Sequence, residues 1–240
     1  MLFHTGYWMN FPGLDFSIHK DGFRFIGIAA AATLLFSMFI VPLAWICAIL
    51  TFFCIFFFRN PRRSVPIDDN LIVSPADGTV CAINFEVPPD ELGLGDEKRY
   101  RISIFLSLFN VHINRLPTTG KIRNIIYSPG SFLNAALEKA SIFNEKNTLI
   151  IEMDGDPSRL MAVSQIAGMI GRRIVCDAHD GQDVSKGKIF GIIRFGSRVD
   201  IWLPVGIAPQ VCSGQTMIGG ETVLADILSN SDIPREGSIV

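Results

Sequence analysis

The stretch that says most about this chain reads Lys188-Ile189-Phe190-Gly191-Ile192-Ile193-Arg194-Phe195-Gly196-Ser197-Arg198-Val199-Asp200-Ile201-Trp202-Leu203. It holds two runs of branched and aromatic residues, Lys188–Ile193 and Val199–Leu203, and such runs are typical of β-strands. Between them lies the pair Gly196-Ser197, and glycine can adopt backbone angles that other residues avoid. The stretch therefore predicts two strands with Gly196 and Ser197 at their junction.

Similar short runs recur upstream of this stretch. They are Leu71–Val73, Arg101–Leu106, Lys121–Tyr127, Thr148–Met153, Arg159–Ile166 and Ile174–Cys176. A short helix is predicted at Phe132–Ala140, with Ser131 in the capping position. The chain lacks the regular alternation of strands and long helices that produces a parallel sheet. We therefore expect a mainly β (α+β) domain with a few short helices.

The region after Pro204 predicts two turns that join short strands. Its central part reads Val211-Cys212-Ser213-Gly214-Gln215-Thr216-Met217-Ile218-Gly219-Gly220-Glu221-Thr222-Val223. This arrangement is typical of a barrel-sandwich, and Ser74-Pro75-Ala76-Asp77-Gly78 is the expected matching half.

A long apolar stretch precedes the β-rich region. From Phe25 to Phe58 the sequence has no charged residue. A single helix of this length would measure about 51 Å, which exceeds a hydrocarbon core of about 30 Å. Pro42 lies near the middle and is expected to break the helix there. Two shorter helices are therefore expected.

Basic residues flank this apolar stretch on both sides. Lys20 and Arg24 precede it, and Arg59, Arg62 and Arg63 follow it. Because positive charge favours the cytoplasmic side, we expect an N-terminal apolar helical hairpin at the cell membrane with both ends in the cytoplasm. The competing interpretation is a buried helix pair. Residues 1–66 are then a membrane-associated segment with its linker, and residues 67–240 are a separate domain.

Composition restricts the classes of partner and cofactor. The net charge is −2, which gives no electrostatic argument for nucleic acid. Five cysteines occur without a CxxC pair, so we predict neither a metal site nor a disulfide framework.

The Gly196-Ser197 pair has an unusual chemical option. A serine hydroxyl can attack the carbonyl that precedes it, and elimination from the resulting ester breaks the chain. The dehydroalanine left on the new N-terminus then hydrolyses to a pyruvoyl group, a ketone able to act in covalent catalysis. The commoner interpretation of a Gly-Ser pair is a turn, and two further pairs occur at Gly130-Ser131 and Gly237-Ser238.

Several sequence pieces, taken in order, resemble the phosphatidylserine decarboxylase proenzymes, in particular their short membrane-associated form. The most specific piece is Lys186-Gly187, Gly191 and Phe195-Gly196-Ser197. The supporting pieces are Ser74–Gly78, Val111-His112, Asn144-Glu145-Lys146-Asn147, and Gly168 with Gly171-Arg172-Arg173-Ile174-Val175. The resemblance extends over roughly residues 24–226.

This resemblance implies a cut between Gly196 and Ser197. The products would be fragments 1–196 and 197–240, joined as a heterodimer, with Ser197 converted to a covalent pyruvoyl cofactor. The implied reaction is decarboxylation of phosphatidylserine to phosphatidylethanolamine and CO2 through a Schiff base. The enzyme would meet this lipid at an anionic membrane surface. The sequence leaves further association into a homo-oligomer open.

The resemblance also implies roles for individual residues. Asp77 and His112 are the candidates for activating Ser197, and His112 is also the candidate for protonating the product carbon. An ordinary Asp-Gly turn and a core histidine are the alternatives. Arg115 occupies the position of a second histidine found in relatives, and it is a candidate for binding the substrate phosphate or carboxylate. Its alternative is a surface charge.

Three consecutive residues form a further candidate site for the substrate. Asn144, Glu145 and Lys146 match an Asn-Glu-basic segment of the resembled family. The competing interpretation is a solvated loop.

Other functions remain open at this point. The main alternative is a membrane-tethered barrel-sandwich module that binds or bridges without catalysis. A second keeps the self-cleavage but acts on a soluble amino acid. A third is a serine hydrolase with Ser197, His112 and Asp77, although Ser197 lacks the G-x-S-x-G motif.

Overall fold

A computed structural model of the chain describes residues 9–10, 16–130, 144–156, 158–168, 173–194 and 196–229. The chain divides into two compact units, residues 1–62 and residues 63–240. The helix expected at Phe132–Ala140, together with Ser131, lies outside the described residues, and so do Phe195, Gly171 and Arg172.

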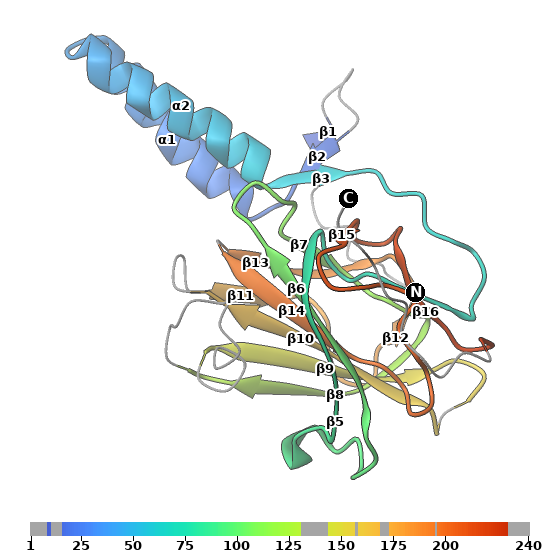
Figure 1. Cartoon of the computed structure of the whole chain (residues 1–240). Coiled ribbons are helices and arrows are strands. Elements are labelled where there is room, and N and C mark those ends of the chain that lie inside the picture. The colour runs from blue at the N-terminus through green and yellow to red at the C-terminus, as the bar shows by residue number, and fades with distance from the viewer. Residues whose placement is uncertain are drawn as a thin grey trace. The chain divides into compact units, whose positions relative to one another are not determined.

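The first unit contains two helices, α1 (Gly22–Ser37) and α2 (Val41–Phe57) (Figure 1). Residues 38–40 connect them, so the apolar stretch is interrupted just before Pro42. Pro42 lies in the first turn of α2, where its missing N–H costs no intrahelical hydrogen bond. The hydroxyl oxygens of Thr33 on α1 and Thr51 on α2 lie 3.3 Å apart, so the two helices are in contact.

A small sheet joins the outer ends of these helices. Its strands are β1 (Met9–Asn10), β2 (Phe16–Ile18) and β3 (Arg59–Pro61), paired in that order. Ile18 pairs with Arg59, and the ring of Phe25 stacks on that of Phe58 at 5.4 Å. No helix among the described residues combines the length and apolar character needed to traverse a bilayer.

The second unit is built on an eight-stranded sheet in the order β12-β8-β9-β10-β14-β6-β5-β15. Its strands are β5 (Gly78–Glu86), β6 (Arg99–Leu106), β8 (Gly120–Ser128), β9 (Lys146–Met153), β10 (Leu160–Ala167), β12 (Asp183–Val184), β14 (Ser197–Trp202) and β15 (Thr216–Met217). Every neighbouring pair is antiparallel, and the sheet curls into a half-barrel (Figure 1). The prediction of a mainly β fold is confirmed.

Two smaller sheets accompany the main one. The first has the order β11 (Arg173–Cys176), β13 (Ile189–Arg194) and β7 (Ile113–Arg115). The second pairs β16 (Val223–Asp226) with β4 (Leu71–Val73), and a 3-10 turn, η1, spans Asp90–Leu92. The expected pairing of the C-terminal turns with residues 74–78 is found, since Met217 pairs with Gly78 and the Ser74 amide donates to the Thr222 carbonyl at 2.8 Å.

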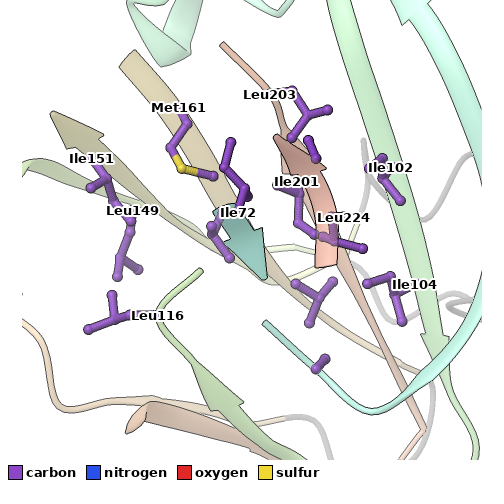
Figure 2. Close-up of a cluster of buried hydrophobic side chains, with 14 of the residues drawn as sticks. Ile72, Ile102, Ile104, Leu116, Leu149, Ile151, Met161, Ile201, Leu203 and Leu224 are labelled. Atoms are coloured by element: carbon purple, nitrogen blue, oxygen red, sulfur yellow. The ribbon is translucent and has the colours of Figure 1, made fainter. Parts of the chain in front are cut away.

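The core lies on one face of the main sheet. Strand register aligns Ile102, Ile201, Val163 and Leu149 across β6, β14, β10 and β9. Ile72, Leu116 and Leu224 close the core from the smaller elements (Figure 2). Each such side chain contributes roughly 1.5–3 kcal/mol when fully buried. This apolar packing fixes the strands on either side of Ser197.

Candidate active site

Ser197 is the first residue of β14, in the interior of the main sheet. Its strand partners are Ala167 on β10 and Leu106 on β6. Because side chains alternate along a strand, Ser197 shares the core face with Val199 and Ile201. The residue is fully buried, and its hydroxyl has no hydrogen-bond partner among the residues that the structure describes. The preceding Gly196 has φ of +45°, a region that favours glycine.

His112 is also fully buried, immediately before β7. Its Nδ1 lies 3.1 Å from the carbonyl oxygen of Asn110. Its own carbonyl accepts a hydrogen bond from the amide of Ile193 at 3.2 Å. Since Ile193 belongs to β13, which leads into Gly196 and Ser197, the fold places His112 beside the segment that contains the candidate cleavage site.

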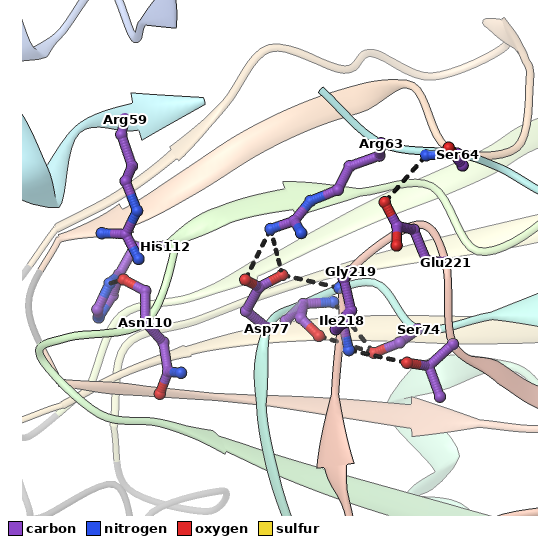
Figure 3. A network of polar contacts seen from close by, with 12 residues as sticks. Arg59, Arg63, Ser64, Ser74, Asp77, Asn110, His112, Ile218, Gly219 and Glu221 are labelled. Atoms are coloured by element: carbon purple, nitrogen blue, oxygen red, sulfur yellow. Dashed lines mark hydrogen bonds and ion pairs between the residues drawn. The ribbon is translucent and has the colours of Figure 1, made fainter. Parts of the chain in front are cut away.

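Asp77 is held in a different set of contacts (Figure 3). Its carboxylate accepts two hydrogen bonds from Nη2 of Arg63, at 2.9 and 2.7 Å, and one from the amide of Gly219 at 2.8 Å. The Ser74 hydroxyl donates to the Ala76 carbonyl at 2.7 Å and so shapes the turn before Asp77. The carboxylate is therefore directed to Arg63 and Gly219, while Nδ1 of His112 faces a backbone carbonyl.

Arg115, on β7, is a largely buried cation. Its Nη1 donates to the Gly187 carbonyl at 3.1 Å. Burial, followed by the nearby charge of Arg63, lowers the pKa of Arg115 to about 10, while Asp77 and Glu221 oppose this shift. Arg115 therefore remains protonated at neutral pH and can attract an anion.

Asn144 and Glu145, two of the candidates for substrate binding, contact β10, the strand that pairs with Ser197. The side-chain amide of Asn144 donates to the Ala167 carbonyl at 2.8 Å, and the Glu145 carbonyl accepts from the Ala167 amide at 2.9 Å. Ala167 is the direct partner of Ser197. The structure thus brings Asn144 and Glu145 next to the region of Ser197.

Lys146 has a different orientation. It pairs with Ile166, which pairs with Arg198, so its side chain lies on the sheet face opposite to that of Ser197. Its Nζ forms a 2.6 Å ion pair with Glu91. Lys146 is not grouped with Ser197 in this arrangement.

Three buried side-chain amides form a chain of hydrogen bonds near Ser197. Two of them lie on the same face of the main sheet as Ser197, and the third belongs to β7. Asn147 on β9 donates to Gln165 on β10 at 3.1 Å, and Gln165 donates to Asn114 on β7 at 2.9 Å. The Asn114 Nδ2 group is buried without an acceptor. Sequence reasoning did not single out Gln165 or Asn114 because an isolated amide within a strand gives no signal of its partners.

Comparison with known proteins identifies the family. A family model described as phosphatidylserine decarboxylase matches residues 50–225. The chain belongs to the phosphatidylserine decarboxylase family. The resemblance found in the sequence is confirmed, and with it the prediction that the chain is an enzyme of this family.

Similar proteins agree over nearly the whole length. The phosphatidylserine decarboxylase proenzyme of Rickettsia rickettsii (strain Sheila Smith) is 52% identical over 209 residues, which cover 87% of this chain and 90% of the relative. That of Beijerinckia indica subsp. indica is 47% identical over 218 residues, which cover 91% of this chain and 92% of the relative.

The structure explains the glycines of the decarboxylase-like motif before Ser197. A Cβ at Gly191 would lie 2.2 Å from the Val175 carbonyl oxygen, so β11 and β13 approach closely only without a side chain there. Gly187 has φ of +78°, and a Cβ there would meet the side chain of Val65 at 2.4 Å. Lys186 donates from Nζ to the carbonyls of Asp68 and Leu71, which fastens the linker to this motif.

Proposed function

We propose that this chain cleaves itself between Gly196 and Ser197 and then decarboxylates phosphatidylserine to phosphatidylethanolamine and CO2. The observation that supports this most directly is the buried Ser197 hydroxyl, which follows a glycine at positive φ and has no hydrogen-bond partner within the described part of the chain. The proenzyme names of relatives up to 52% identical agree with a chain that matures by cleavage.

The proposed cleavage uses only groups of the chain and water. The Ser197 hydroxyl oxygen bonds to the Gly196 carbonyl carbon while the peptide C–N bond breaks, which gives an ester and a free Ser197 amine. Removal of the Ser197 Cα proton expels the Gly196 carboxylate from Cβ and leaves dehydroalanine. Water then replaces the nitrogen, which leaves as ammonia, and Ser197 becomes a pyruvoyl group. We assign the activation of the hydroxyl to His112 with Asp77.

The surroundings of Ser197 fit a small polar group of this kind. No existing hydrogen bond holds the hydroxyl, and the Asn114 amide is a buried donor without an acceptor in the same region of the fold. A pyruvoyl group would supply a ketone that binds the substrate amine and accepts the electron pair left on the substrate carbon when CO2 departs. Gln165 and Asn114 would orient and polarise groups there through their amides.

The remaining candidates are assigned to substrate binding and proton transfer. Arg115, protonated and largely buried, would bind the phosphate or carboxylate of the lipid. Asn144 and Glu145 would line the same region through their contacts with Ala167. Lys146, on the other sheet face, would support the segment through Glu91 rather than touch the substrate. His112 would return a proton to the substrate carbon after CO2 leaves.

After cleavage the two fragments would remain together. β14 of the small fragment lies between β10 and β6 of the large one, and β15 and β16 pair with β5 and β4. A noncovalent heterodimer of residues 1–196 and 197–240 is therefore expected.

We further propose that residues 1–66 hold the enzyme at the cell membrane with residues 67–240 on the cytoplasmic side. The helices and their connection expose large apolar side chains, among them Leu34, Met38, Phe39, Trp45, Ile49 and Phe52. A substrate with two acyl chains stays in the bilayer, so an enzyme held at an anionic surface would meet it there.

The test is to trap the substrate on the protein. Wild-type chain and Ser197→Ala are incubated with radiolabelled phosphatidylserine and a hydride reductant, then separated on a denaturing gel. The proposal expects CO2 release and label on the small fragment of the wild type alone. A tethered binding module would release no CO2 and hold no label on either chain.

A further inference from the structure

We propose that Arg63 is a positioning residue for self-cleavage, which fixes the carboxylate of Asp77 in one orientation. This inference rests on the proposed function, because it concerns the rate at which the Gly196-Ser197 bond is cut. The sequence suggested only that Arg63 belongs to a basic cluster facing an anionic membrane. The structure gives it a specific partner instead.

The contact between the two side chains is close and sheltered. Nη2 of Arg63 lies 2.9 and 2.7 Å from the two carboxylate oxygens of Asp77. Only 12% of the Arg63 side chain and 16% of the Asp77 side chain are exposed. Solvent-exposed ion pairs contribute little, but a pair shielded from water is stronger and fixes the geometry of both partners.

The backbone around Arg63 is also held in place. The amide of Ser64 donates to the Glu221 carboxylate at 2.9 Å, and Val65 packs against Gly187. Figure 3 shows Arg63 above the Asp77 carboxylate, Gly219 beside that carboxylate, and Ser64 next to Glu221. The backbone that carries Arg63 is thus fixed in place. Its guanidinium therefore restricts the positions that the Asp77 carboxylate can adopt.

Asp77 and His112 belong to segments that the backbone joins. The amide of Arg115 donates a hydrogen bond to the Pro75 carbonyl at 2.8 Å. Pro75 lies two residues before Asp77, and Arg115 lies three residues after His112. Asp77 therefore lies near two cations, and of its hydrogen-bond donors Arg63 is a charged side chain, while Gly219 contributes a backbone amide. Without Arg63, the carboxylate would be free to turn toward Arg115 and would lose its fixed orientation.

The chain offers a matched control one residue earlier. Arg62 has the same charge and lies in the same linker, but it is exposed. If these arginines act only by attracting an anionic membrane, Arg62→Met and Arg63→Met should behave alike. If Arg63 acts through Asp77, only Arg63→Met should affect cleavage.

The experiment follows cleavage of the full chain after synthesis. Wild type, Arg62→Met, Arg63→Met, Arg63→Lys and Ser197→Ala are made in a cell-free system with vesicles of phosphatidylcholine and phosphatidylglycerol. A pulse of labelled amino acid is chased, and the uncut fraction is measured on denaturing gels. Methionine keeps a long unbranched side chain without the charge, whereas lysine keeps the charge without the planar guanidinium.

We expect Arg63→Met to slow cleavage by roughly tenfold or more, the scale of a lost hydrogen bond to a charged group. Arg63→Lys should fall between Arg63→Met and the wild type, and Arg62→Met should match the wild type. The inference is overturned if Arg63→Met cuts at the wild-type rate, if lysine is no better than methionine, or if Arg62→Met is equally slow. If Arg63 acts only through packing, methionine should preserve the cleavage rate. Faster cleavage with lysine than with methionine would instead indicate that the charge is needed.

The outcome also separates this inference from the proposed function. If the wild type stays whole through the chase, the proposed self-cleavage itself fails. If the wild type is cut and Arg63→Met keeps pace with it, only the role of Arg63 fails.

Discussion

A buried hydroxyl without a hydrogen-bond partner costs a folded protein free energy, and Ser197 has such a hydroxyl. The neighbouring residues show how the fold satisfies most other polar groups on this face. Asn147, Gln165 and Asn114 form one chain of amides in which each link is 3.1 Å or shorter. At the end of this chain of amides, the Nδ2 group of Asn114 has no acceptor among the described residues. Ser197 and Asn114 are therefore two of the buried polar groups that the described residues leave unsatisfied.

Gln165 is the link on which this chain of amides depends. Gln165→Leu would leave the Asn147 donor and the Asn114 acceptor buried without that partner. We expect it to lower the free energy of unfolding by about 2 kcal/mol or more, since each buried unsatisfied group costs about 1–3 kcal/mol. Urea unfolding in the uncut Ser197→Ala background measures this without interference from cleavage.

The control for Gln165→Leu is Asn124→Leu, an exposed amide on β8 of the same sheet. It should change stability by no more than about 0.5 kcal/mol. Equal losses in both variants would show that the amide chain has no special part in stability.

The residues of the candidate site differ in how far the sequence could predict them. Ser197 was found because the motif before it and the chemistry of a Gly-Ser pair point to the same bond. Arg63 was interpreted only as one of the basic residues that flank the apolar stretch, because its pairing with Asp77 depends on how the linker folds back onto the turn at Gly219. Gln165 and Asn114 are 51 positions apart in the sequence, and only strand register brings them together.

At the scale of elements, β13 contains Gly191 of the motif before Ser197 and leads to the candidate cleavage site. Gly191 pairs with Cys176 on one side and Asn114 on the other. Gly191→Ala would place a methyl group 2.2 Å from the Val175 carbonyl oxygen and push β11 and β13 apart. We expect a loss of roughly 2 kcal/mol or more in unfolding free energy, by overpacking, and slower cleavage in the same pulse-chase assay.

Gly27→Ala is the comparison for this substitution. It lies within α1, and an added Cβ meets nothing within 4 Å. Because alanine favours helix more than glycine by about 1 kcal/mol, it should leave cleavage unchanged and stability unchanged or higher. If Gly191→Ala is as harmless as Gly27→Ala, the close approach of β11 and β13 is not important.

The longer strands were predictable because runs of branched residues are a local property. β6, β8, β9, β10 and β14 each overlap a run identified in the sequence. β7 was not predicted, because its sequence Ile113-Asn114-Arg115 is not a run of branched or aromatic residues. Pro42 correctly indicated a break in the apolar stretch, although the interruption lies just before it rather than at it.

At the scale of the whole molecule, the apolar composition of residues 25–58 agrees with helices that keep large side chains exposed. Trp45, Ile49 and Phe52 lie on one face of α2 and are 69%, 67% and 72% exposed. We expect the combined replacement of these three residues by glutamine to move the protein from the vesicle pellet to the supernatant in a sedimentation assay. Each of the three substitutions removes apolar side-chain area that would otherwise enter the lipid.

The same triple variant contains its own control. Self-cleavage belongs to residues in the second unit, so the fragments should still form at the wild-type rate. Retention of the variant on vesicles of phosphatidylcholine and phosphatidylglycerol would contradict the proposed role of these helices.

The most direct test of the central claim is the intact mass of the purified wild-type chain beside that of Ser197→Ala. The account predicts two masses for the wild type, one for residues 1–196 and one for residues 197–240 with a blocked, ketone-bearing first residue. Ser197→Ala should give one mass for the uncut chain. An active wild-type sample that consists of a single unbroken polypeptide would contradict the account.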